Sequence, residues 1–280
     1  MNEFNIRDKV AVITGGAGVI CSVMARSLAD KGVKCAILDL NEEAAFSVAN
    51  EIEKDFAIPS IGLSANVLDR MSLMAAKKAI NDKFGTIDIL VNGAGGNSPA
   101  GTTKVEKMGG TDDENFEDTF FGLKIEGFDK VFDINLKGTI IPSMVFATDM
   151  VRKKSGVIIN ISSMNSYRPL TKIAAYSAAK AAINNFTQWL AVHFSKTGVR
   201  VNAIAPGFLL TNQNRFLLID EKTGGPTPRG MKVITSTPME RYCIPEELTG
   251  TLLYLVSDLS KFVTGVVIPV DGGFSAYSGV

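Results

Sequence analysis

The sequence predicts a doubly wound α/β fold, in which helices cover both sides of a parallel sheet. Short apolar runs rich in β-branched residues alternate along the chain with longer segments of helical period. The apolar runs show little polar alternation, as is typical of strands that are buried on both faces. Helices that separate such strands form right-handed crossovers, so we expect three layers of helix, sheet and helix.

Four apolar runs mark strands in the first half of the chain: KVAVIT, KCAILDL, PSIGLSA and DILVNGAG, at residues 9–14, 34–40, 59–65 and 88–95. Each run has the length of a strand, and turn-forming residues lie beside it. The longer segments between them carry apolar residues at helical spacing, which predicts helices over 18–31, 41–55 and 69–84. The first half is therefore a repeated βαβ unit.

The second half continues the alternation with longer elements. A long helix is expected to end near Lys154, and the runs GVIINISS and VRVNAIAPG predict strands on either side of a helix from about Ala174 to Lys196. A helix at 245–257 precedes a last strand within VTGVVIPVDGG. Because no repeat or linker divides the chain, we expect residues 1–280 to form a single domain of the Rossmann type.

Two long polar stretches interrupt this alternation, at 96–115 and 208–237. Each follows the C-terminal end of an expected strand, which is where ligands bind in open α/β sheets. We expect the two stretches to build the substrate pocket. Surface loops without a specific role are the alternative.

The composition excludes several classes of function. Lys and Arg together number 29, as do Asp and Glu, so no basic surplus favours nucleic acid or anionic lipid. A single histidine, His193, gives little basis for a hydrolytic triad or a zinc site, and we expect no metal. The three scattered cysteines suit a reducing compartment. Without a membrane-length apolar run or the features of a secretory signal, a cytoplasmic protein is expected.

A glycine-rich turn follows the first strand. In VAVITGGAGVI, the chain runs through Gly15 and Gly18 into the helix expected over 18–31, whose first turn contains Val19 and Ile20, so backbone N–H groups can face a pyrophosphate. The next strand ends at Asp39, where a carboxylate accepts the ribose hydroxyls of NAD and repels the extra phosphate of NADP. We therefore expect NAD (NADH) as cofactor. The alternative for Asp39 is the N-cap of the following helix.

Further residues at the ends of strands complete the expected cofactor half. Asn66 and Val67 follow the third strand in a position suited to the adenine edge. The small residues of NGAG let the backbone approach a flat ligand closely. The additional cofactor contacts expected here are Leu40, Asn66, Val67, Asn92, Gly93 and Ala94.

The strongest chemical signal is Tyr176 followed four residues later by Lys180, which places phenol and ammonium on one helical face. A phenol with a pKa of about 10 is a poor base at neutral pH, but an adjacent cation lowers that pKa. Ser163 ends a strand thirteen residues before Tyr176, where its hydroxyl can hydrogen-bond a reacting carbonyl or alcohol oxygen. These three side chains form a candidate catalytic group.

Together with Asn135 in VFDINLKG, these motifs give a chain that resembles the single-domain branch of the short-chain dehydrogenase/reductase family over nearly its whole length. The resemblance implies that Tyr176 is the general acid/base and that Lys180 lowers its pKa and holds the nicotinamide ribose. It further implies that Ser163 polarises the substrate oxygen and that Asn135 positions a water leading to Lys180.

The same resemblance extends to PGFLLT and to the terminal VDGG. It implies that Pro206, Gly207 and Phe208 shape the loop beside the nicotinamide, and that Thr211 contacts the cofactor's amide or phosphate. It also implies a tetramer built from dimers through the long helix that ends near Lys154 and the helix that carries Tyr176. Coverage of the sheet explains the apolar pattern of both helices equally well.

The chain departs from the family pattern at the start of the first helix and after the fourth strand. The usual TGxxxGxG would place glycines at positions 19 and 21, which are Val19 and Cys21 here, and the usual NNAG is NGAG. We expect Cys21 to be a packing residue, located where the helix lies on the sheet, rather than a redox centre.

The segments SSMNSYRPL, APGFLLTNQNR and VDGGFSAYSGV resemble members of the family that act on sugar acids. Such a substrate needs several hydrogen-bonding groups and a guanidinium that grips its carboxylate. The expected substrate contacts, besides Ser163 and Tyr176, are Asn97, Asn165, Arg168, Gln213, Asn214 and Arg215. For the two arginines, solvated loop charges are the alternative.

The reaction that this resemblance implies is the reversible reduction of D-fructuronate to D-mannonate with NADH. Gluconate 5-dehydrogenase, or another sugar or ketone reductase of the family, is the nearest alternative. A protein that binds NAD(H) as a sensor, without turnover, is a further one. Intact Ser163, Tyr176 and Lys180 argue against the sensor.

Overall fold

A computed structural model describes residues 4–109, 115–211 and 214–279, and within them seven strands form one parallel sheet. The spatial order is β3-β2-β1-β4-β5-β6-β7. The strands are β1 (Val10–Thr14), β2 (Lys34–Asp39), β3 (Ser60–Ser64), β4 (Ile89–Asn92), β5 (Gly156–Ile161), β6 (Val199–Pro206) and β7 (Val267–Val270). The predicted doubly wound α/β sheet is confirmed.

The α-helices are α1 (Val19–Asp30), α2 (Glu42–Phe56), α3 (Arg70–Phe84), α4 (Ile125–Phe132), α5 (Gly138–Arg152), α6 (Ala174–His193), α7 (Arg215–Leu218), α8 (Pro228–Thr235) and α9 (Thr249–Val256). Short 3₁₀ turns are η1 (Pro99–Gly101), η2 (Phe116–Asp118), η3 (Phe120–Gly122), η5 (Met164–Ser166), η6 (Pro245–Leu248) and η7 (Asp258–Ser260), and η4 (Asp133–Lys137) is a π-helical turn. No helix within the described ranges is both long and apolar enough to cross a membrane.

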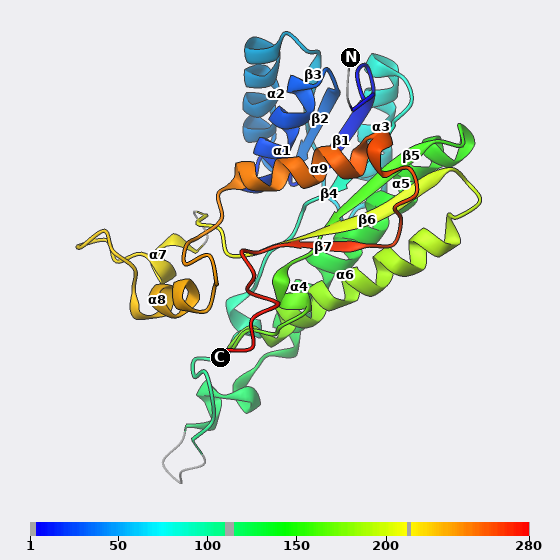
Figure 1. The fold of residues 1–280 in the computed structure, drawn as a ribbon. Coiled ribbons are helices and arrows are strands. Elements are labelled where there is room, and N and C mark those ends of the chain that lie inside the picture. Colours follow the sequence, from blue (N-terminus) through cyan, green and yellow to red (C-terminus); the bar gives the residue numbers. More distant parts are fainter. Residues whose placement is uncertain (1–3, 110–114, 212–213, 280) are drawn as a thin grey trace.

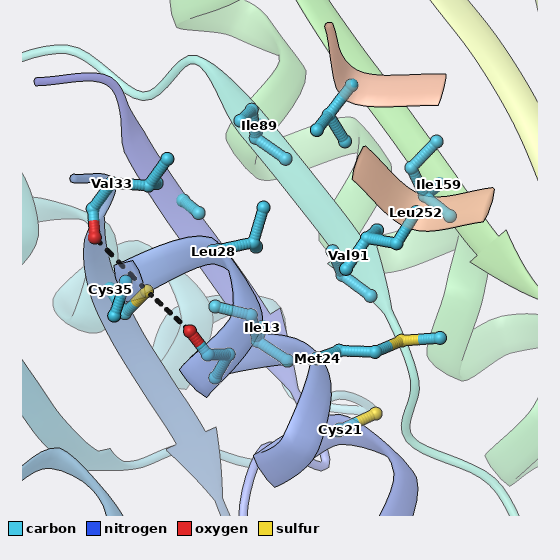
Figure 2. Packing of buried hydrophobic residues seen from close by; sticks show 14 of the residues in the cluster. Ile13, Cys21, Met24, Leu28, Val33, Cys35, Ile89, Val91, Ile159 and Leu252 are labelled. Atoms are coloured by element: carbon cyan, nitrogen blue, oxygen red, sulfur yellow. Dashed lines mark hydrogen bonds between the residues drawn. The ribbon is translucent and has the colours of Figure 1, made fainter. Parts of the chain in front are cut away.

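Side chains of the strands alternate between two buried layers. On one face Ile13 and Val91 pack with α1, α2 and α9, and Figure 2 shows part of this layer. On the other face Val12 and Leu90 pack with α3, α5 and α6. Because both faces are covered, the strands are apolar on both sides, which is why the sequence shows apolar runs rather than alternation.

The sheet places the carboxyl ends of its strands at one edge. Thr14, the last residue of β1, is in register with Leu38 of β2 and Asn92 of β4, and Asn92 is in register with Asn160 of β5. The chain leaves β1 toward β2 and β3, then crosses back to β4 on the other side of β1. The crevice beside β1 and β4 is therefore the switch point where doubly wound folds bind ligands.

The structure differs from the sequence prediction in how the longer elements are built. The long helix before Lys154 consists of α4, the π turn η4 and α5, and the helix at 245–257 begins as the 3₁₀ turn η6. The polar stretch after β6 contains the short helices α7 and α8. Figure 1 shows the segments after β4 and after β6 projecting beyond the end of the sheet at which β6 and β7 finish.

Candidate active site

The glycine-rich turn packs tightly against the chain that leaves β4. Gly15 has φ +60°, and a Cβ atom there would lie 2.9 Å from the Ala94 backbone. Both conditions require glycine at this position. Gly18 is the N-cap of α1 and makes no side-chain capping bond, so the first backbone N–H groups of the helix remain available to an anion. The turn has the form of a pyrophosphate cradle.

Asp39 ends β2 beside this turn. Its Oδ2 accepts a hydrogen bond from Ala17 N at 3.3 Å, and its Oδ1 accepts one from Asn41 N at 3.1 Å. The N-cap of α2 is Asn41, whose side chain accepts from Ala44 N. The alternative that Asp39 caps the following helix is therefore wrong, and its carboxylate lies beside the glycine-rich turn.

The expected adenine end lies after β3. Asn66 is exposed and Val67 is buried, and Asn66 Oδ1 accepts a hydrogen bond from Leu68 N at 2.9 Å. Leu40 is 67% exposed at the end of β2, and α3 begins only at Arg70. The segment between β3 and α3 thus forms a turn with one exposed amide and one buried apolar side chain, and its contact with adenine stays a prediction.

Residues 93–96, here called the strap, connect the cofactor side of the site to its catalytic side. Thr14 Oγ1 accepts hydrogen bonds from the N–H groups of Gly93 at 3.1 Å and Ala94 at 3.3 Å. A Cβ atom on Gly95 would lie 2.7 Å from Asn135 Oδ1 and 3.4 Å from Lys180 Nζ. The strap is therefore held by Thr14 of β1 at one end and by Asn135 at the other.

Asn135 is fully buried in the π turn between α4 and α5. Its Nδ2 donates to Gly96 O at 2.7 Å and to Val131 O at 2.8 Å, and its Oδ1 accepts from Gly96 N at 3.3 Å. A π turn widens the helix and directs a side chain that a regular helix would place elsewhere. Asn135 thus fixes the end of the strap beside Lys180.

Ser163, Tyr176 and Lys180 meet between β5 and α6. Ser163 follows the end of β5, and its Oγ accepts a hydrogen bond from Asn165 N at 3.2 Å. Tyr176 and Lys180 lie one turn apart on α6, with Lys180 Nζ 5.6 Å from the centroid of the Tyr176 ring. Lys180 Nζ also donates to Ile161 O at 2.9 Å, so its ammonium is anchored to the last residue of β5.

The pKa values of these groups reflect their burial. Burial raises the pKa of the Tyr176 phenol, and a hydrogen bond with the Ser163 side chain acts in the opposite direction. This differs from the expectation that Lys180 lowers the pKa of Tyr176. The reason is that burial of the phenol itself disfavours the phenolate. Burial also lowers the pKa of Lys180, to about 8. At neutral pH the site holds a protonated phenol beside a protonated lysine.

The chain after β6 is packed against the end of β7. Gly207 N donates to Val270 O at 2.9 Å, and a Cβ atom on Gly207 would lie 2.6 Å from the Asp271 backbone, which explains the Pro206-Gly207 pair. The Phe208 ring meets the Phe274 ring edge-on, with centroids 5.3 Å apart. Thr211 N donates to Asn214 Oδ1 at 2.8 Å.

Of the expected substrate contacts, Asn165 is the most deeply placed. It is 5% exposed, and its Oδ1 has no hydrogen-bond partner within the described part of the chain. Arg168 is exposed, and its Nε donates to Ser275 O at 3.2 Å, which joins this segment to the C-terminal tail. Asn97 is exposed, and its Nδ2 donates to Thr102 Oγ1 at 3.2 Å.

The remaining expected substrate contacts lie after β6. Asn214 Nδ2 donates to Leu209 O at 2.8 Å while its Oδ1 accepts from Thr211 N, so this amide closes the loop between them. Arg215 is exposed at the start of α7. Gln213 lies outside the described residues. The structure thus gives Asn214 a role in shaping the loop, which the sequence pattern did not indicate.

Asn92, an expected cofactor contact, is buried and belongs to a chain of polar side chains that sequence reasoning did not predict. Asn92 Nδ2 donates to Ser143 Oγ and to Asn160 Oδ1, both at 2.9 Å, and Asn160 Nδ2 donates to Thr187 Oγ1 at 2.8 Å. The chain ties β4 and β5 to α5 and α6. The available signal was the asparagine in the otherwise apolar run GVIINI, because a buried amide needs polar partners.

The site therefore joins an anion cradle and an acidic strand end to a Ser-Tyr-Lys group, on the switch point of a parallel sheet. Among the described residues, no three His, Cys, Asp or Glu side chains group so that they could hold a metal ion. This arrangement defines an oxidoreductase that acts with a dinucleotide.

The chain belongs to the short-chain dehydrogenase family, whose model matches residues 9–222. It is 52% identical to an uncharacterized oxidoreductase of Bacillus subtilis, over 99% of this chain and 98% of that protein. It is 31% identical to a 2-dehydro-3-deoxy-D-gluconate 5-dehydrogenase of Dickeya dadantii, over 99% of each.

A crystal structure of a protein from Haemophilus influenza, provisionally named a D-mannonate oxidoreductase and containing bound NAD, superposes with a TM-score of 0.93. The two chains are 52% identical, and the match covers 100% of this chain and 99% of that one. These comparisons establish the family and the fold for the part of the chain that carries the site.

Proposed function

We propose that this protein is an NAD-dependent oxidoreductase that interconverts a sugar-acid ketone and its secondary alcohol, with D-fructuronate and D-mannonate as the pair. The observation that carries the proposal is the Ser163, Tyr176 and Lys180 group beside the glycine-rich turn. The provisional name of the 52% identical Haemophilus protein, together with its bound NAD, supports the choice of substrate and cofactor.

The residues present fit NAD. Gly18 would present the N-terminus of α1 to the pyrophosphate, Asp39 would accept the adenosine ribose hydroxyls, and Lys180 would hold the nicotinamide ribose. The negative charge of Asp39 would oppose the additional phosphate of NADP. When bound, NADH supplies the hydride that the chain itself cannot provide.

The chain's own part in the reduction is to hold the ketone oxygen and give it a proton. The Ser163 hydroxyl would donate a hydrogen bond to that oxygen, and the Tyr176 phenol would transfer its proton there. Because burial raises the pKa of Tyr176, the phenol is protonated at neutral pH and suited to act as an acid. The Lys180 ammonium would stabilise the phenolate that remains, and solvent would return the proton.

Asn165 supports a polyhydroxylated substrate. Its buried Oδ1 lacks a partner among the described residues and lies two positions after Ser163, so a substrate hydroxyl could donate to it. Arg168, on the same segment, would offer its guanidinium to the carboxylate, and Asn97 and Arg215 would contribute from the two polar stretches. A simple ketone would leave these groups unused.

A second candidate is the reduction of 5-ketogluconate, a sugar acid that carries its ketone at the same carbon as D-fructuronate and differs in the configuration of a hydroxyl. The 31% identity to the Dickeya 5-dehydrogenase over the full chain favours it, because that substrate is also a hydroxylated carboxylate. The catalytic group would work identically, and only the contacts to the substrate would differ.

NADH consumption by the purified protein with D-fructuronate, 5-ketogluconate and an unsubstituted ketone distinguishes these candidates. We expect kcat/KM to be highest for D-fructuronate, by about tenfold or more over 5-ketogluconate, since a misplaced hydroxyl costs about 1.4 kcal/mol or more. The opposite order would establish the second candidate. Activity confined to the unsubstituted ketone would refute a sugar-acid substrate altogether.

We also propose that the protein forms a homotetramer through α5 and α6. Met144, Trp189 and Val192 are 55%, 58% and 75% exposed on these helices, which is unusual for large apolar side chains on two neighbouring elements. A monomer in light scattering would contradict this assembly.

A further inference from the structure

Two departures from the family pattern, the cysteine at 21 and the glycine at 93, meet in space. A Cβ atom built on Gly93 would lie 2.1 Å from Cys21 Sγ, far closer than two such atoms can approach. Cys21 lies in the first turn of α1 and Gly93 follows β4 directly. The contact therefore joins the two sides of the switch point.

The Cys21 thiol fills this contact as an apolar group. Cys21 is 4% exposed and belongs to the buried layer that also contains Met24 and Val91 (Figure 2). Burial raises the pKa of Cys21 to about 12, so the sulfur stays protonated. There is room at this point for the sulfur or for a side chain at position 93, but not for both.

The position of Gly93 matters because it begins the strap. Its N–H and that of Ala94 donate to Thr14 Oγ1, and Gly95 lies against Asn135 and Lys180. The strap has little slack, since it is fixed at both ends. A displacement at Gly93 would therefore move the backbone beside both the glycine-rich turn and the catalytic lysine.

We propose that Cys21 and Gly93 form a steric pair in which the thiol sets the spacing between α1 and the strap, and thereby shapes the NAD cradle. Cys21 is thus a positioning residue that acts through the strap. In this chain the side chain that fills the contact comes from α1, at Cys21, and position 93 is glycine. In the family pattern position 21 is glycine, and the side chain comes from the strap, at the second asparagine of NNAG. The inference rests on the proposed use of NAD.

A double-mutant cycle with Cys21→Ala and Gly93→Ala tests the pair, with the NADH dissociation constant measured by fluorescence titration. We expect Gly93→Ala alone to weaken NADH binding about tenfold or more, and only about threefold in the Cys21→Ala background. Without the sulfur, the new Cβ would meet the Cβ at position 21 at 3.6 Å, an ordinary contact. The rescue is partial because the same atom would lie 2.9 Å from Thr14 O.

The matched control is Cys35→Ala, which removes a fully buried thiol from β2 in the same layer. It should lower the unfolding temperature while leaving the NADH dissociation constant unchanged. Equal losses from Gly93→Ala in both backgrounds would overturn the proposal, as would NADH affinities that simply follow unfolding temperature in every variant, Cys35→Ala included.

If Gly93→Ala fails to fold, recovery of folded, NADH-binding protein on adding Cys21→Ala supports the pair, and continued misfolding overturns it. Failure of the steric pair can be distinguished from failure of the proposed function. Wild-type protein that binds NADH without reducing any sugar acid refutes the proposed substrate and leaves the cycle intact. Additive losses in the cycle refute only the steric pair.

Discussion

The partly buried Tyr176 and the buried Lys180 lie one helical turn apart, and loss of solvent moves their pKa values in opposite directions. The pKa of Tyr176 is raised and that of Lys180 is lowered to about 8, because in each case burial disfavours the charged form. At neutral pH the Tyr176 phenol is consequently neutral and the Lys180 amine is cationic. This protonation state suits reduction, in which the phenol gives up a proton and the amine stabilises the phenolate.

A pH dependence follows from the lowered pKa of Lys180. Below about pH 8 the amine is protonated and can stabilise the phenolate, whereas above that value the cation is lost, so kcat/KM for reduction should fall as pH rises through about 8. Steady-state rates at saturating NADH between about pH 6 and pH 10 would show this descending limb. Reduction that stays constant up to about pH 10 would contradict the role given to Lys180.

Asp39 should control the choice between NADH and NADPH. Asp39→Asn keeps an oxygen acceptor at the site but removes the negative charge that repels the extra phosphate. We expect the preference for NADH, measured as the ratio of kcat/KM values, to fall about tenfold or more, which corresponds to about 1.4 kcal/mol. Asp69→Asn, which removes the carboxylate that caps α3 at the same edge of the sheet, should leave the ratio unchanged.

At this scale the sequence was sufficient to bring Ser163, Tyr176 and Lys180 together as one candidate group, but not to predict the contacts around them. The spacing of Tyr176 and Lys180 is local to one helix and can be read from the sequence directly. The contact between Cys21 and Gly93 and the use of Asn214 to close its own loop depend on backbone positions that local patterns do not determine. From the sequence, Cys21 and Gly93 could be recognised only as departures from the family pattern, and Asn214 was expected to contact the substrate instead.

Individual elements are also joined by buried polar contacts at the edge of the sheet where β4 begins, opposite the site. Lys77 on α3 and Asp149 on α5 form an ion pair with Nζ and Oδ1 2.6 Å apart, and their side chains are 16% and 6% exposed. Asp149 Oδ2 also accepts from Asn81 Nδ2 at 3.0 Å and from Ile87 N at 3.3 Å. These bonds hold α3 and α5 to the chain that enters β4, the strand whose end carries the strap.

Asp149→Asn should destabilise the protein by about 3 kcal/mol at neutral pH, because it leaves the Lys77 charge buried without its partner. Burial by itself would raise the pKa of Asp149, but the bonds from Lys77, Ile87 and Asn81 leave it lowered. A lowered pKa contributes stability above the unfolded value near 3.8 that is lost as pH falls. The difference between wild type and variant in denaturant melts should therefore shrink below about pH 4.

The exposed pair Lys78–Asp82 on the same helix provides the comparison. Its side chains are 77% and 64% exposed, so Asp82→Asn should change stability by no more than about 0.5 kcal/mol. An Asp149→Asn variant as stable as Asp82→Asn would show that the buried pair does not hold these elements together.

Elements with a strong periodic pattern were predicted closely. β2 was expected at 34–40 and runs over Lys34–Asp39, and α3 was expected at 69–84 and runs over Arg70–Phe84. The π turn that carries Asn135 was not predicted, because the apolar period continues through it from α4 into α5. Its hydrogen bonding is set by the packing of Asn135 on the strap, which is a tertiary contact.

For the whole molecule, the parallel topology explains why residues from Gly15 to Lys180 meet at one site. Each strand delivers its following residues to the same edge, and the crossing from β3 to β4 opens a crevice between the cofactor side and the catalytic side. The sequence predicted this topology because alternating buried strands and helices allow few alternatives. The substrate could not be fixed in the same way, since its contacts come from stretches without a regular period.

The comparison of wild type with Tyr176→Phe, measured for both D-fructuronate reduction and NADH binding, tests the central claim most directly. Loss of the hydroxyl removes the proton donor while keeping the ring that packs beside Lys180. We expect kcat to fall about 10²-fold or more, with the NADH dissociation constant changed by less than about threefold. Unchanged turnover in Tyr176→Phe would contradict proton transfer by this residue.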